Sequence, residues 1–203
     1  MSSPSSSLNP SRSTADLVVE SAMQLFSRYG YRRTSMVDIA REAGLAKATL
    51  YLHYEGKEDV LRAVQERMID AVTRRCDEAE AAPVPFRERL HRMIDARFGA
   101  AFEVFNDHDS LPELKKAWPT AGGERLIAHE AEYRARLAKM IATAEQSGEI
   151  TLARCGLTPE AIIRLLVSNA VGAKWDRELS KSVPAYRAHL ADLASLIAAA
   201  VER

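Results

Sequence analysis

The sequence predicts an all-α protein of about nine helices. Three observations predict this fold class. Alanine, leucine, arginine and glutamate dominate the composition, and these residues have high helix propensity. Apolar residues recur at spacings of three and four, whereas no segment alternates with a period of two. With 203 residues, of which 47% are hydrophobic, the chain can form one compact domain or two small ones.

In the first half of the chain, the helix boundaries follow from capping and breaking residues. Gly30 can end the first helix at its C′ position. Ser35 can cap the second helix, and Asp38 favours its positive end, while Gly44 limits its length. Pro83 breaks the fourth helix. The expected helices cover about 13–29, 35–43, 47–53 and 57–81.

Beyond Pro85 the periodicity predicts five further helices. Thr158 followed by Pro159 is a common helix start, because proline is tolerated in the first turn. Gly148 ends the preceding helix, the one expected at about 124–146. The expected helices cover about 86–105, the segment "LPELKKAW", 124–146, a stretch opening at Pro159, and a last one from Pro184 to the C-terminus.

The segment "MVDIAREAGLAKATLYLHY" has the outline of a helix-turn-helix, at about residues 35–54. Its apolar residues can close against Leu25 and Phe26 on the first helix, and Gly44 permits the sharp turn. With Leu50 buried, the third helix exposes hydrogen-bonding groups, namely Lys47, Thr49, Tyr51 and His53. Such groups suit base edges and phosphates, so this face fits the DNA major groove. A fourth helix starting at Lys57 adds a positive charge.

This segment, continued to "YEGKEDVL", resembles the DNA-binding signature of the TetR family of bacterial transcriptional regulators. The resemblance covers about 12–72 and includes the upstream "AMQLFSRYGYRRTS". It implies a DNA-binding domain at 12–72 and a helical ligand-binding and dimerisation domain at 73–203, after a disordered tail at 1–11. One position departs from the family pattern: Leu52 stands where a phosphate-contacting residue is common, so that contact is missing or replaced by one to a thymine methyl. The resemblance places DNA contacts at Thr34, Ser35, Lys47, Thr49, Tyr51, His53, Tyr54 and Lys57.

The middle helices contain candidates for a ligand pocket. Aromatic walls with a few polar groups are how such pockets are built, although an aromatic stripe is more often plain core. His129 and Glu130 fall where an apolar stripe should continue, which indicates either an exposed edge or a polar ligand anchor. The candidate ligand residues are Met93, Phe98, Phe102, Phe105, Trp118, His129, Glu130 and Tyr133.

The last two helices carry regular apolar stripes. Either could close the body's own core, but two such stripes better suit a two-fold four-helix interface between two copies of the chain. The expected homodimer interface consists of Ile162, Leu166, Asn169, Ala173, Tyr186, Leu190, Leu193 and Ile197.

Several classes of function lack support in the sequence. Two cysteines far apart favour neither a disulfide framework nor a zinc site, and we expect no metal or cofactor. The 28 basic and 28 acidic residues balance, so the net charge gives no hint of a partner. No apolar run is long enough to span a membrane, and a cytoplasmic location is expected.

We therefore predict a homodimeric regulator of transcription, a repressor released from a near-palindromic double-stranded DNA operator by a small-molecule effector. Two alternatives remain at this point. One is a helical small-molecule-binding protein without DNA function. The other is an all-α enzyme, although we find neither paired carboxylates nor a nucleophile motif nor a glycine-rich phosphate loop, and so expect no catalysis.

Overall fold

The computed structural model describes residues 13–105 and 111–202, and for 104, 105 and 111–122 it describes the helical backbone. The described chain is helical throughout, which confirms the all-α prediction. The helices of the first half are α1 (Thr14–Tyr29), α2 (Met36–Glu42), α3 (Lys47–His53) and α4 (Lys57–Ala81). Those of the second half are α5 (Phe86–Ile94), α6 (Ala100–Phe105), α7 (Leu111–Gln146), α8 (Pro159–Ala173) and α9 (Val183–Val201). The predicted tail at 1–11 lies outside the described residues.

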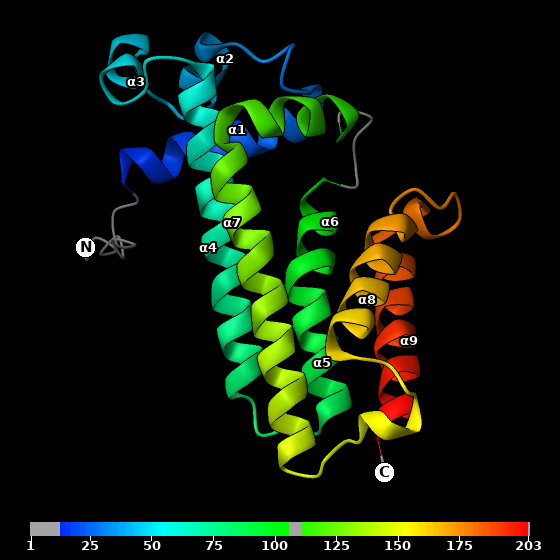
Figure 1. The fold of residues 1–203 in the computed structure, drawn as a ribbon. Helices are drawn as coiled ribbons and strands as arrows, with labels where there is room; N and C mark the ends of the chain where they lie inside the picture. Colours follow the sequence, from blue (N-terminus) through cyan, green and yellow to red (C-terminus); the bar gives the residue numbers. More distant parts are fainter. Residues whose placement is uncertain (1–12, 106–110, 203) are drawn as a thin grey trace, which may run out of the picture.

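The helices form a small head and a larger body, joined by α4 (Figure 1). Helices α1, α2 and α3 gather around the first turns of α4, with α3 at the outer end of the head. Below them α4 and α7 run side by side, and α5 with α6, then α8 and α9, complete the body. One helix thus belongs to both parts and connects them.

Each part has its own buried apolar cluster. The head cluster extends from Val18 to Val64 and includes Phe26, Ile39 and Leu50. The body cluster begins at Val72 on α4 and draws on α5 to α9. The two clusters therefore meet along α4, between Val64 and Val72.

One predicted division in the body is wrong, and one predicted helix contains an irregular turn. The segment "LPELKKAW" and the stretch 124–146 form the single helix α7, which bends between head and body (Figure 1). Pro119 and the pair Gly122–Gly123 lie within it, and such residues can kink a helix without ending it. The stretch 86–105 is continuously helical, but Asp95–Gly99 forms a π-helical turn.

The π-helical turn depends on a glycine. A Cβ atom at Gly99 would lie 2.0 Å from Oδ1 of Asp95, so any larger residue would displace that carboxylate. Asp95 is ion-paired with Arg187 on α9 at 3.0 Å. The turn therefore lets an acidic side chain lie along its own helix and contact the last helix of the body.

Within residues 13–105 and 111–202, every helix is too short or too polar to cross a bilayer.

Candidate nucleic-acid interface

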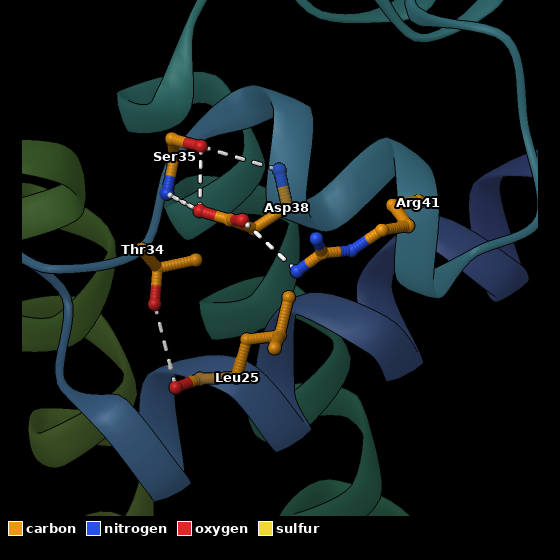
Figure 2. A network of polar contacts seen from close by, with 5 residues as sticks. All are labelled: Leu25, Thr34, Ser35, Asp38 and Arg41. Carbon is orange, nitrogen blue, oxygen red and sulfur yellow. Dashed lines mark hydrogen bonds and ion pairs between the residues drawn. The ribbon is translucent and has the colours of Figure 1, made fainter.

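The corner between α1 and α2 is held by Thr34 (Figure 2). Only 3% of this residue is exposed, and its hydroxyl donates to the carbonyl of Gly30 at 2.9 Å and lies 3.4 Å from that of Leu25. The predicted DNA contact by the Thr34 side chain is therefore wrong. Because the hydroxyl is buried and already bonded, it fixes the entry to α2 instead.

Ser35 begins α2 as its N-cap. Its Oγ accepts from the backbone N–H of Asp38 at 3.2 Å, and its own N–H donates to the Asp38 carboxylate at 3.0 Å (Figure 2). This reciprocal pair satisfies backbone N–H groups that a helix start leaves free. The Ser35 hydroxyl also holds the pKa of Asp38 below its usual value. The predicted cap is confirmed, and Ser35 stays exposed at the surface of the head.

The turn between α2 and α3 is made by Gly44. Its φ of 67° lies in the left-handed region that residues with a side chain rarely adopt. The N–H of the next residue, Leu45, then donates back to the carbonyl of Ala40 at 2.9 Å. This bond closes the turn and sets the direction in which α3 leaves it.

Helix α3 buries one residue and exposes most of the others. Leu50 is fully buried in the head cluster, while Lys47, Tyr51 and His53 are exposed and Thr49 is half-buried. Nζ of Lys47 lies 5.7 Å from the centre of the Tyr51 ring, a cation–π distance. Three of the four polar residues that the sequence predicted to be exposed on α3 are thus exposed, and the apolar Ala48 and Leu52 are exposed beside them.

Lys57 forms hydrogen bonds with backbone carbonyls of the head. Its Nζ donates to the carbonyls of Tyr31, Arg32 and Thr34, at 2.7, 3.3 and 2.8 Å, and lies 4.4 Å from the centre of the Tyr31 ring. An ammonium group has three N–H donors, so all of them are engaged. Burial lowers the pKa of Lys57. Its charge caps the α1–α2 loop, and the DNA contact at Lys57 stays a prediction.

Tyr54 follows α3 and is half-buried against the head cluster. Burial raises the pKa of its hydroxyl. Of the predicted DNA residues, the structure brings Lys47, Thr49, Tyr51 and His53 together on α3, with Ser35 at the start of α2.

In the body, three of the predicted ligand residues take part in two aromatic ring contacts. The Phe98 and Tyr133 rings are 5.9 Å apart and nearly perpendicular, and the Tyr133 hydroxyl donates to the carbonyl of Met93 at 3.1 Å. Phe102 stacks on Tyr186 with ring centres 4.2 Å apart. All five are buried. The side chains of Phe105 and Trp118 lie outside the described residues.

Two buried polar groups in this region lack partners. His129 is 8% exposed, and within the described chain neither of its ring nitrogens has a hydrogen-bond partner. Nε of Arg97 is also buried and unpaired, although this guanidinium donates to Glu130 through Nη2 at 3.2 Å. Burial, and secondly the charge of Arg97, lower the pKa of His129. An exposed helix edge, one of the two explanations offered for His129, is therefore excluded.

Most of the predicted dimer residues are wrong, because they lie inside their own chain. Five are at most 5% exposed and belong to the body cluster, and the predicted residues concerned are Ile162, Leu166, Ala173, Tyr186 and Leu190. Only Asn169 is exposed, while Leu193 and Ile197 are half-buried. The regular stripes of α8 and α9 close the body. Large hydrophobic side chains are exposed nearby, namely Leu165, Val171, Trp175 and Leu196.

The three-helix head, with a glycine turn and an outward polar helix, defines a helix-turn-helix protein. Residues 18–64 match the family model described as bacterial regulatory proteins, tetR family. Residues 18–64 are therefore similar to the DNA-binding region of this family.

The curated relatives share this region. The uncharacterized HTH-type transcriptional regulator YhgD of Bacillus subtilis strain 168 is 30% identical over 80 residues, which cover 39% of this chain and 42% of that protein. The HTH-type transcriptional repressor ComR of Escherichia coli K12 is 40% identical over 55 residues, covering 27% and 26%. The chain thus spans less than half the length of these relatives.

Solved structures share the whole fold. A TetR transcription regulator from Haloarcula marismortui has a TM-score of 0.76 at 18% identity, covering 94% of this chain and 98% of that one. SmeT in complex with triclosan has a TM-score of 0.66 at 17% identity, covering 95% and 93%. The arrangement of head and body is therefore shared with known structures.

Proposed function

We propose that this chain is a homodimeric DNA-binding regulator of transcription, a repressor released from its operator by a small-molecule effector. The observation that carries the proposal is the geometry of α3, where Leu50 is fully buried while Lys47, Tyr51 and His53 are exposed. A short helix propped outward in this way can enter a major groove. ComR, which shares this part of the sequence, is a transcriptional repressor, and this supports repression as the function. The proposal assigns no catalytic activity to the chain.

The contacts to DNA would come from α3 and from the start of α2. Lys47, Thr49, Tyr51 and His53 would contact bases and phosphates, and Ser35 would contact a phosphate at the start of α2. Lys57 and Thr34 would act indirectly, because they hold the loop that orients α2.

A second copy would pack on the exposed apolar side chains of α8 and α9. These include Leu165 at 56% and Leu196 at 70% exposure, beside the half-buried Leu193 and Ile197. On the same side, Asn169 and His189 join the two helices through a contact of 2.7 Å. Two-fold pairing of these faces would place the two α3 helices about 34 Å apart, one for each half of a near-palindromic operator.

An effector would bind in the body near His129. The aromatic groups Phe98, Phe102 and Tyr133 would surround it, and His129 with Nε of Arg97 would supply hydrogen bonds. Unpaired buried polar atoms are costly, so a ligand that bonds to them gains affinity. Triclosan in the related fold of SmeT supports such a role for the body.

The effector would act on DNA through α4. This helix starts at Lys57 under the head and ends in the body, where Arg136 of α7 pairs with Asp77 and Glu80. An effector that binds one arrangement of the body more tightly shifts α4 and so changes the separation of the α3 helices.

Selection of binding sites from random duplex DNA, with the full chain, tests this proposal. We expect an inverted repeat with half-sites about one helical turn apart, bound by two copies of the chain. Affinity should fall steeply as salt rises, and Lys47→Ala should reduce the salt slope by about one. A protein that selects no sequence, or that binds as a monomer, contradicts the proposal and favours a carrier without DNA function.

A further inference from the structure

The part of α3 that points farthest from the head is apolar. Successive residues of an α-helix are rotated by about 100°, so Ala48 and Leu52 lie about 160° around the helix from Leu50 on either side. Leu50 is fully buried, while Ala48 is exposed and Leu52 is 84% exposed. The polar residues Lys47 and Tyr51 lie on one flank of this ridge. Thr49 and His53 lie on the other flank.

No other large hydrophobic side chain that the structure describes is as exposed as Leu52. Single exposed leucines are common and carry no meaning by themselves. This one lies at the crest of the helix that would enter the groove, at the outer end of the head (Figure 1). It is also flanked on both sides by hydrogen-bonding groups. Any duplex that receives α3 therefore meets the ridge of Ala48 and Leu52 first.

In the major groove, the group that suits an aliphatic side chain is the C5 methyl of thymine, which only A·T pairs present. The other base edges present donors and acceptors, which a leucine would leave unsatisfied. A leucine at this place therefore disfavours base pairs that lack a methyl and favours those that present one. The same chemistry gives the methyl of Ala48 a partner.

We propose that Ala48 and Leu52 are specificity-determining residues that contact thymine methyl groups in each operator half-site. The inference rests on the proposed function, because it requires α3 in the major groove. Four residues of helix span about 6 Å and base pairs are stacked about 3.4 Å apart. With α3 lying along the groove, the two methyl groups belong to base pairs about two steps apart.

The test replaces each thymine of the selected duplex with deoxyuridine, which removes the methyl and keeps the base pair. For the wild-type chain we expect Kd to rise about fourfold at one or two positions per half-site, the value of one buried carbon. At the position that Leu52 contacts, Leu52→Ala should bind the thymine and deoxyuridine duplexes with equal Kd. At the position that Ala48 contacts, Ala48→Ser should lose the difference in Kd between the two duplexes.

A matched control is Ile127→Ala on α7, another exposed large hydrophobic residue at 73%. It should keep the full sensitivity to deoxyuridine. The double-mutant cycle between side chain and methyl separates direct contact from a general loss of affinity.

Three outcomes overturn the inference. The first is that the selected half-sites contain no thymine. The second is that deoxyuridine changes the wild-type Kd by less than twofold at every position. The third is that Leu52→Ala keeps the wild-type sensitivity to deoxyuridine. In all three the chain still selects a specific duplex, so the proposed function stands. A chain that selects no duplex loses the proposed function and this inference together.

Discussion

Head and body differ in the hydrogen bonding of their buried polar groups. In the head, the buried Thr34 hydroxyl and the partly buried Lys57 ammonium are bonded to backbone carbonyls. In the body, neither ring nitrogen of His129 nor Nε of Arg97 has a hydrogen-bond partner among the described residues. A buried donor or acceptor without a partner costs about 1–3 kcal/mol.

This difference distinguishes a head whose polar contacts are made within the chain from a body that could bind a further molecule. The head needs nothing further to hold α3 in place, because the contacts around its corner are made within the chain. The body buries polar atoms that have no partner among the side chains that the structure describes. Perturbing the head should therefore change stability and DNA affinity together, whereas perturbing His129 should change how the free energy of unfolding depends on pH.

The largest expected effect is that of Leu50→Ala. This residue is fully buried, and truncation of a buried leucine costs about 2–5 kcal/mol. The head cluster is small, so the head should unfold at a lower temperature than the body, and DNA binding should be lost. Thermal unfolding followed by circular dichroism would then show two transitions.

Leu52→Ala is the matched control, since Leu52 is 84% exposed on the same helix. It should change the free energy of unfolding by less than about 0.5 kcal/mol. Equal destabilisation by the two variants would mean that α3 is not packed on the head through Leu50.

Lys57→Met and Lys47→Met form the second comparison. Loss of the Lys57 ammonium leaves the carbonyls of the α1–α2 loop without a donor and should cost about 1–2 kcal/mol of stability. Lys47 is exposed, so its replacement should leave stability within about 0.5 kcal/mol. DNA affinity measured against salt should lose about one unit of slope for Lys47→Met only. A lower slope for Lys57→Met would show that Lys57 does contact a phosphate.

Ser35→Ala and Thr158→Ala compare one helix cap in the head with one in the body. Both side chains accept from a backbone N–H three residues on, at 3.2 Å. Each replacement should cost about 1 kcal/mol in chemical denaturation, the usual value of such a cap. Only Ser35→Ala should weaken DNA binding, because only this cap orients α2. Equal DNA affinities of the two variants would contradict the role of Ser35.

The smallest expected effect concerns His129 and pH. Burial lowers the pKa of His129 in the folded chain, so at acidic pH the unfolded chain binds more protons. The neutral His129 therefore supports the fold fully above the unfolded pKa of about 6.5. This support is lost as the pH falls toward the folded value.

His129→Gln should show less loss of unfolding free energy between pH 8 and 5 than the wild-type chain. Urea titrations across this range measure the difference. Identical pH dependence of the two proteins would mean that His129 is not buried in its neutral form.

The sequence was most informative where local chemistry decides the structure. Ser35 with Asp38 marked the start of α2, Gly44 marked the turn, and α3 and α4 have the predicted limits. Such signals act within a few residues and need no tertiary partner. Helix α7 was misjudged because Pro119 and the glycine pair can either end or bend a helix, and the rest of the fold selects between these outcomes.

The predicted site residues succeeded or failed for the same reason. The exposed face of α3 follows from the helical period once Leu50 is buried. In contrast, the stripes of α8 and α9 have the same spacing whether they pack inside the chain or against a second copy. Lys57 looked like an anion-binding residue, because nothing in the sequence shows that the carbonyls of Tyr31 and Thr34 lie within its reach.

By itself, the sequence determined the helical class, the helix-turn-helix and its outward residues, because propensity, capping and periodicity are properties of neighbouring residues. Only the tertiary structure decided which side of α8 and α9 is core, that Thr34 and Lys57 hold the head together, and that His129 is buried. Those features depend on groups far apart in the chain, and their positions relative to one another are set only when the helices pack.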